Sequence, residues 1–259
     1  MLSVYSTLEE TLFLWVKNFW YLVALSLIVG TPIVFLSHFG LDQHSALRHS
    51  TGLPRLVALI SSICSLVLMA FNPAAILGLM RRQTLGTTVV SAVFGNIKKY
   101  TWTLFRLQIL IAFTAIIMLI PLVAIGRMLA VLQVILPLKM YSIFGVGLAL
   151  VLLKYALADP LIVVENFGAW NALKRSWVMT KGHFWYVAGC YLFLGAGNWI
   201  LNWLFSALLK DTDSGLNWLW LSTHLGLRLF DSLWIILSWC IYLRIKKTDE
   251  PALPAATVS

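Results

Sequence analysis

The pattern of hydrophobic and polar positions divides the chain into long apolar segments that are separated by shorter polar ones. Six of the apolar segments contain about 20 residues or more, the length that an α-helix needs to cross a bilayer. They are Phe19–Phe39, Leu56–Met80, Leu107–Met128, Tyr141–Val164, Phe184–Leu209 and Leu216–Leu243. The pattern therefore predicts an all-α integral membrane protein with six transmembrane helices.

Three polar segments, ahead of the first, third and fifth predicted spans, have the periodicity of amphipathic helices. Their apolar residues recur every three or four positions and their charged residues lie off that face, as in a helix that lies in the membrane interface. The apolar positions are Tyr5, Leu8, Leu12 and Trp15 in the first segment, Val90, Val93, Phe94 and Ile97 in the second, and Trp170, Leu173 and Trp177 in the third.

Three tryptophans mark the ends of these segments at a nearly constant interval. Trp20 and Trp102 are 82 residues apart, and Trp102 and Trp185 are 83 apart. A fixed period is typical of internal repeats. We expect a single membrane domain over residues 1–247, followed by a disordered cytoplasmic tail over 248–259. The domain would contain three parallel repeats, each an interfacial helix followed by a transmembrane hairpin, over about 3–80, 86–163 and 168–246.

Composition and charge support the membrane class and indicate the topology. Charged residues make up 11% of the chain and hydrophobic ones 60%, whereas soluble domains carry about 25% charged residues. A soluble enzyme is therefore excluded. The net charge of +9 arises mainly from basic residues between the spans, which indicates anionic membrane lipids and not nucleic acid as partners. The positive-inside rule places both termini and the basic connections in the cytoplasm.

The segment from Ala158 to Val187 reads ADPLIVVENFGAWNALKRSWVMTKGHFWYV. Its pattern of A-x-P-L-I-V-x-E, a glycine, A-L-x-x-S-W and T-x-G-x-F-W resembles bacterial inner-membrane proteins of the YciC-like family. It is also similar to the membrane domain attached to some glycerophosphodiester phosphodiesterases. The resemblance implies a multi-pass bacterial inner-membrane protein without an assigned reaction. The catalytic domain of those phosphodiesterases is separate, and the segments outside the predicted spans are too short to form one.

Ionisable residues inside or beside spans are candidates for function. Lys154 and Asp159 share the fourth predicted span and are five positions apart, about 140° around a helix. A partner for Lys154 must come from another helix, a lipid phosphate or water. Arg228 and Asp231 are three positions apart and can pair on one helix face, and Asp231 is also a possible partner of Lys154 across the bundle. Structural alternatives are a lysine that snorkels and a local ion pair.

Four further basic residues are candidates for binding anionic headgroups at the cytoplasmic ends of the amphipathic segments, namely Lys98, Lys99, Lys174 and Arg175. Elsewhere the sequence favours structural interpretations. Glu165 precedes the third amphipathic helix, whose positive end it would favour, and Ser176 has no histidine near it in sequence. His38, His44 and His49 lack the i, i+4 spacing of helix-borne zinc sites. We therefore predict no catalytic residue, no metal site and no cofactor.

Two functions fit these features. The first is a non-enzymatic membrane protein that serves envelope or lipid homeostasis, with anionic lipids as partners and with a membrane-protein partner or a second copy of the chain as further possibilities. The second is a small-solute transporter or channel with a polar cavity between the three hairpins, suggested by Lys154, Asp159 and the prolines at positions 73 and 160.

Overall fold

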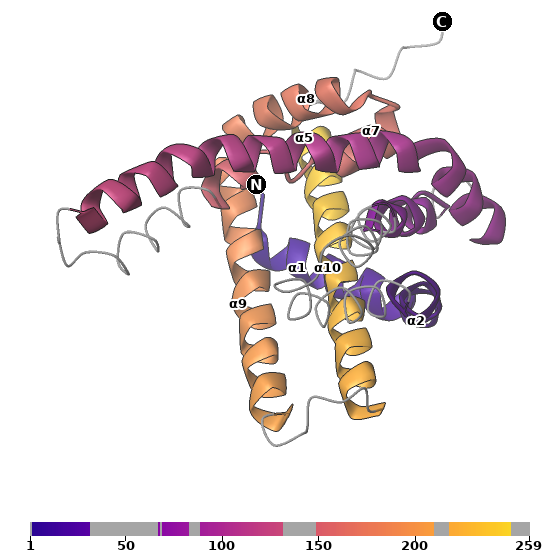
Figure 1. Cartoon of the computed structure of the whole chain (residues 1–259). Coiled ribbons are helices and arrows are strands. Elements are labelled where there is room, and N and C mark those ends of the chain that lie inside the picture. The colour runs from indigo at the N-terminus through magenta and orange to yellow at the C-terminus, as the bar shows by residue number, and fades with distance from the viewer. Residues whose placement is uncertain are drawn as a thin grey trace, which may run out of the picture.

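The fold is given by a computed structural model that describes residues 2–31, 67, 69–82, 89–131, 149–209 and 218–249. Every element within these ranges is helical, which confirms the all-α class (Figure 1). Short helices cover 69–82 and 149–153. The remaining elements are α1 (Val4–Lys17), α2 (Phe19–Leu25), the π-helical turn η1 (Ser26–Gly30), α5 (Val89–Val131), α7 (Ala158–Glu165), α8 (Ala169–Gly182), α9 (Phe184–Leu209) and α10 (Trp218–Asp249).

Two helices within these described ranges are long and apolar enough to cross a membrane. They are Val93–Ile117 within α5 and Phe184–Leu201 within α9. The segments Val4–Lys17 and Phe19–Val29 pass the same test together, but they are bent by 71° at the break between them. By their length and composition these helices suggest a membrane protein. The first, second, fourth and sixth predicted spans lie partly outside the described residues, so six spans remain a prediction.

Helices α9 and α10 lie side by side and run in opposite directions (Figure 1). The start of α9 lies near the end of α10, where His183 and Asp249 are 3.1 Å apart. Farther along the pair, the rings of Tyr191 and Trp234 stack with 5.4 Å between their centroids. These helices correspond to the fifth and sixth predicted spans. α10 continues to Asp249, two residues beyond the predicted end of the membrane domain, and 250–259 lie outside the described residues.

A break in the helix lies at the predicted boundary in two of the three predicted repeats. A single residue interrupts the helix two positions before the tryptophan: Asn18 follows α1, and His183 follows α8. The expected boundary before Trp102 is wrong, because α5 is one helix of 43 residues that runs through it. Residues 98–105 of α5 contain no Asn, Gly or His, whereas Asn18 stands at the first break and His183 follows Gly182 at the third.

The buried core lies at one end of the α9–α10 pair. It is built by helix 69–82, α5, α7, α8 and the last turns of α10, which meet at the end nearest α8 in Figure 1. α5 packs against α7 and α8 and crosses α9 and α10 instead of running parallel to them. Away from this core, α9 carries large exposed apolar residues, namely Leu192, Phe193, Trp199, Ile200, Trp203 and Leu204. Such a surface is expected where a helix faces lipid.

The predicted apolar stripes do not form single membrane-facing surfaces. Leu8 of α1 and Leu173 of α8 are buried within the protein, whereas Tyr5 and Trp170 of the same stripes are exposed. Each stripe is therefore divided between packing against neighbouring helices and facing outward. Periodicity identifies an apolar face but does not determine which part of that face a neighbouring helix covers.

Candidate functional site

The helix of the fourth predicted span is interrupted at Lys154. The backbone N–H groups of Lys154, Tyr155 and Ala156 each donate to the carbonyl three residues earlier, at 3.1, 2.9 and 3.2 Å. Regular helix resumes at Ala158. Pro160 accounts for the position of the break, because its ring conflicts with a helical carbonyl at Ala156, four residues earlier. The proline therefore interrupts the helix upstream of itself instead of only bending it.

The Ser176 side chain of α8 satisfies the backbone that this break exposes. Its hydroxyl donates to the Lys154 carbonyl at 2.8 Å and accepts from the Leu157 N–H at 3.2 Å. A longer bond of 3.5 Å joins the Thr180 hydroxyl to the same carbonyl. Ser176 and Thr180 are fully buried. Ser176 therefore has a structural role: its hydroxyl forms hydrogen bonds with two backbone groups at the break in the helix.

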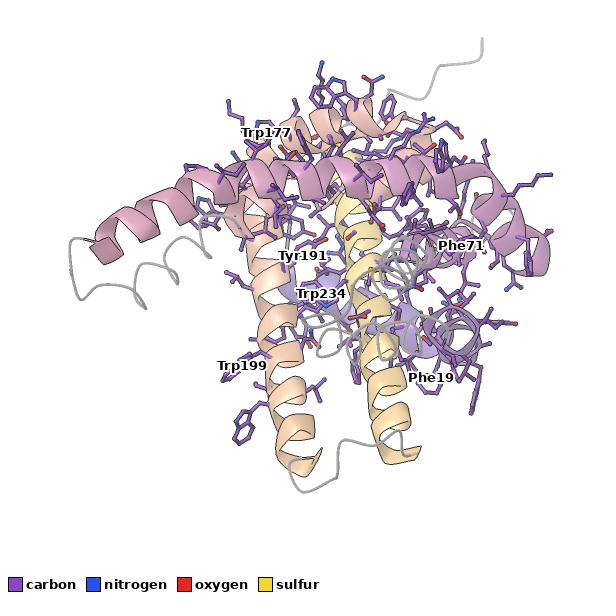
Figure 2. All side chains as sticks on the ribbon, viewed as in Figure 1. Phe19, Phe71, Trp177, Tyr191, Trp199 and Trp234 are labelled. Atoms are coloured by element: carbon purple, nitrogen blue, oxygen red, sulfur yellow. The ribbon has the colours of Figure 1, made fainter. Side chains whose placement is uncertain are left out.

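The Lys154 ammonium group lies over the ring of Trp177, 3.9 Å from its centroid. Trp177 belongs to α8 and is labelled at the top of Figure 2. A cation over an indole face is stabilised by the quadrupole of the ring. The partner of Lys154 thus comes from another helix, one of the possibilities left open by the sequence. The pairing of Lys154 with Asp231 across the bundle stays a prediction.

The other ionisable candidates of the spans lie on α7 and α10. Asp159 is half-buried in the first turn of α7, where a carboxylate is favoured by the helix dipole. Asp231 is half-buried on α10, and the side chain of Arg228 lies outside the described residues, so their pairing remains a prediction. Between α9 and α10, Tyr191 bonds with Ser238 at 2.5 Å and stacks on Trp234 (Figure 2).

The structure brings two of the predicted basic segments together. Lys98 and Lys99 of α5 and Lys174 and Arg175 of α8 are all exposed, and α5 packs against α8. We call these four residues the basic elbow. Two of its ammonium groups lie near aromatic rings: Lys99 is 4.9 Å from the Tyr100 centroid, and Lys174 is 5.4 Å from that of Trp170.

The turn between α7 and α8 is held by contacts that the sequence did not suggest. Asn166 has a left-handed backbone, with φ of 57°, and its side chain accepts a hydrogen bond from the Tyr100 hydroxyl. Arg81 donates to the Val163 carbonyl at 3.0 Å and to the Tyr100 hydroxyl at 3.2 Å. Tyr100 is buried. An asparagine shortly after an apolar helix was the available signal for the turn.

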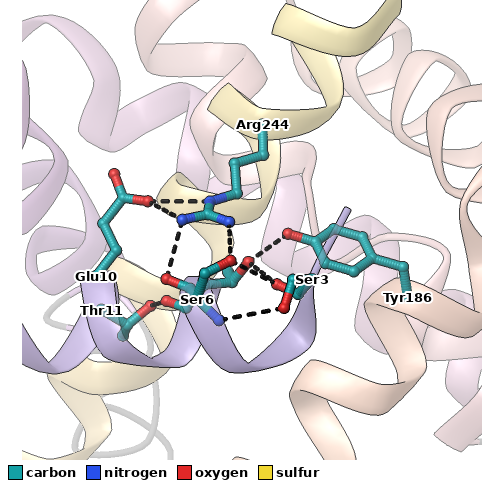
Figure 3. Close-up of polar contacts among 7 residues, drawn as sticks. Ser3, Ser6, Glu10, Thr11, Tyr186 and Arg244 are labelled. Atoms are coloured by element: carbon teal, nitrogen blue, oxygen red, sulfur yellow. Dashed lines mark hydrogen bonds and ion pairs between the residues drawn. The ribbon is translucent and has the colours of Figure 1, made fainter. Parts of the chain in front are cut away.

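A second unpredicted cluster joins α1 to the end of α10 (Figure 3). The Arg244 guanidinium donates to the Glu10 carboxylate at 2.8 and 3.0 Å and to the Ser6 carbonyl at 2.9 Å. Beside it, Thr7 bonds with the Tyr186 hydroxyl of α9 at 2.6 Å. The partners are more than 170 positions apart in sequence, so helical spacing gives no indication of these contacts.

Glu165 forms a third polar contact with α10. Its carboxylate accepts from the Tyr242 hydroxyl at 2.6 Å and from the Lys246 ammonium at 3.0 Å. Burial raises the pKa of Glu165, but the Tyr242 and Lys246 hydrogen bonds and the charges of Lys246 and Arg175 outweigh it and hold the pKa below its ordinary value. Glu165 ends α7 and bonds to α10, and its expected effect on the positive end of the next helix stays a prediction.

The remaining titratable candidates lie apart from these clusters. The half-buried His183 is 3.1 Å from the Asp249 carboxylate, whereas His38, His44 and His49 lie outside the described residues. Within the part of the chain that the structure describes, no three His, Cys, Asp or Glu side chains gather as metal ligands. Cys190 and Cys240 are buried free thiols.

Two grooves lie along these helices. One, of about 150 Å³, is between α1, α9 and α10 and is mainly apolar. The other, of about 460 Å³, is between α5 and the start of α8. Neither is lined by Lys154 or Asp159.

Comparison of the chain with protein-family models, curated proteins and solved structures finds no match. The YciC-like resemblance therefore remains a prediction that rests on the segment from Ala158 to Val187.

Proposed function

We propose that the protein is a non-enzymatic membrane protein that binds anionic lipid headgroups through its basic elbow. The observation that carries the proposal is the exposure of the three repeat tryptophans. Trp20 is 77% exposed, Trp102 59% and Trp185 84%. A tryptophan at headgroup level keeps its ring in apolar surroundings and its N–H in polar ones, which explains why three tryptophans at equivalent positions point outward.

Charge supports lipid headgroups as the partner. Each Lys or Arg near an anionic membrane surface contributes about 1 kcal/mol of attraction. The four charges of the basic elbow therefore provide at most about 4 kcal/mol, roughly a thousandfold in affinity. The packing of α5 against α8 supports a shared binding surface for these charges.

The cellular setting is part of the same proposal. The excess of basic residues on one side of the predicted spans favours cytoplasmic termini and a basic elbow at the cytoplasmic leaflet. The resemblance of the third repeat to YciC-like proteins favours the bacterial inner membrane and a role in envelope or lipid homeostasis. Cysteine-accessibility labelling of the two termini in spheroplasts tests the orientation.

Native mass spectrometry of the detergent-purified protein tests lipid binding. We expect the wild type to retain phosphatidylglycerol, and replacement of Lys98, Lys99, Lys174 and Arg175 by Gln to reduce that retention at least tenfold. The control removes the same number of charges at Arg48, Arg55, Arg127 and Lys139, which are predicted to lie on the opposite side. Equal retention by the wild type and the elbow variant would refute the proposal.

Transport is a second candidate because the helix is discontinuous at Lys154. Broken helices often line the substrate path of transporters. In a chain whose native cysteines are replaced by Ser, we would introduce Lys154→Cys and apply a membrane-impermeant maleimide. Labelling in intact cells would show a water-filled path to this position and favour transport. Absence of labelling, with full labelling after denaturation, would favour a closed bundle in which Lys154 only packs on Trp177.

A further inference from the structure

One exposed face of α5 begins with the aromatic Trp102 and the basic Arg106 and continues with apolar residues from Ile109 to Ile120. The residues of this face are three or four positions apart and form a single stripe. The large apolar members are 49 to 62% exposed, and Arg106 is exposed as well. We call this surface the α5 stripe; it consists of Trp102, Arg106, Ile109, Phe113, Ile116 and Ile120.

A groove lies beside Arg106 and Ile109, where the stripe passes from a basic residue to apolar ones. It has a volume of about 460 Å³ and is formed by α5 and the residues that begin α8. Arg106 lines it together with Ile109, Gly168 and Trp170, so a guanidinium, an indole and apolar side chains face one space. The Arg106 guanidinium also lies 5.3 Å from the Trp102 ring centroid, which keeps it on this face of α5.

Charge complementarity identifies the class of occupant. Exposed basic residues lie on both of the helices that form the groove, and Glu165, the last residue of α7, is already bonded to Lys246. An arginine fork matches the geometry of a phosphate and binds it by charge-assisted hydrogen bonds. The groove therefore favours an anionic ligand that also carries apolar groups.

The apolar part of the stripe matches the tails of such a ligand. Ile109 and Ile120 are eleven residues apart, which is about 16 Å along a helix. The stripe therefore presents an exposed apolar surface of this length to the hydrocarbon part of a ligand. We infer that one anionic phospholipid docks on α5, with its phosphate at Arg106 in the groove and its acyl chains along the stripe. The inference rests on the proposed lipid-binding function and adds a single specific site to it.

Gly168 offers a sharp test of this site. It caps the start of α8 with φ of −68° and ψ of 156°, a conformation open to any residue, and a Cβ there meets nothing within 4 Å. Asp is a better helix cap than Gly, so Gly168→Asp should not lower the unfolding midpoint. The same carboxylate would repel a phosphate in the groove. Gly168→Asp is therefore expected to weaken lipid binding without lowering the unfolding midpoint.

The experiment measures retained phosphatidylglycerol and phosphatidylcholine by native mass spectrometry of the full chain. We expect Gly168→Asp and Arg106→Gln each to weaken phosphatidylglycerol binding about tenfold, because each opposes one charge-assisted contact. Phosphatidylcholine binding should change less. The matched control is Gly182→Asp at the other end of α8, where a Cβ also meets nothing within 4 Å. That end is about 20 Å away, beyond the reach of screened charge.

The outcomes separate this inference from the proposed function. Loss of phosphatidylglycerol in both groove variants but not in Gly182→Asp supports the site. Unchanged retention in the groove variants, with loss in the variant that lacks the basic elbow charges, overturns the site and leaves the proposed function standing. A wild type that retains no phosphatidylglycerol overturns the proposed function, and the site with it.

Discussion

Replacement of Ser176 by Ala tests how much one buried hydroxyl stabilises the protein through its hydrogen bonds at the helix break near Lys154. The hydroxyl accepts from the Leu157 N–H at 3.2 Å and donates to the Lys154 carbonyl at 2.8 Å. Ser176 and Leu157 are fully buried, so water cannot replace either bond without opening the core. The substitution leaves the Leu157 N–H without the acceptor it has here.

The expected cost follows from the two groups that lose a partner. A buried donor left unsatisfied costs about 1–3 kcal/mol. The Lys154 carbonyl retains the 3.5 Å bond from Thr180, so its loss is smaller. We therefore expect Ser176→Ala to lower the free energy of unfolding by about 2 kcal/mol.

The assay is equilibrium unfolding in dodecylmaltoside micelles with increasing sodium dodecyl sulfate, followed by far-ultraviolet circular dichroism. Thr114→Val is the matched control, because the Thr114 hydroxyl also donates to a carbonyl, that of Leu110, at 2.8 Å. Both residues belong to the uninterrupted helix α5, where that carbonyl has a backbone partner as well. The control should cost less than about 0.5 kcal/mol. Equal stability of Ser176→Ala and Thr114→Val would refute the reasoning.

Three further predictions address other contacts and are checked by the same unfolding assay. The Arg244→Glu and Glu10→Arg variants should each be less stable than wild type, and the double exchange should recover only part of the loss, because the bond from Arg244 to the Ser6 carbonyl is not restored; full recovery would contradict the role of Ser6. The pKa of Glu165 is lower in the fold than its ordinary value of 4.5, so its stabilising contribution is present above pH 4.5 and is lost as the pH falls through the folded pKa. Glu165→Gln should therefore be less stable than wild type at pH 7 and approach it under acid conditions, whereas a pH-independent difference would contradict the ion pair with Lys246. Gly95→Ala should raise stability by about 0.5–1 kcal/mol, because Gly95 is exposed inside α5 and a Cβ there meets nothing within 4 Å; a loss would contradict a regular helix at this position.

Local pattern predicted the parts of the fold that depend on local physics. Helical class follows from long apolar segments, and the fifth predicted span has the same bounds as α9, Phe184–Leu209. The helix is interrupted at Asn18 and at His183, near the expected boundaries of the first and third predicted repeats. In the second predicted repeat the helix α5 continues through the expected boundary. The residues beside Trp102 are compatible with a helix, and this compatibility does not reveal whether the helix breaks there.

Local pattern predicted less of the candidate site. It singled out Lys98, Lys99, Lys174 and Arg175, because charge beside an apolar segment is visible in sequence. It did not predict that α5, which carries Lys98 and Lys99, packs on α8, which carries Lys174 and Arg175. Arg106, which lines a groove with the start of α8, was not among the predicted site residues.

The sequence by itself determined that the chain is helical, apolar enough for a membrane and basic at the ends of its apolar segments. These properties depend on composition and on periods of three and four residues. Only the tertiary structure decided that Lys154 packs on Trp177, that Ser176 closes the break beside it, and that Arg244 joins Glu10. Each of these contacts joins helices through residues more than 20 positions apart, and helical periodicity carries no information about which faces of separate helices meet.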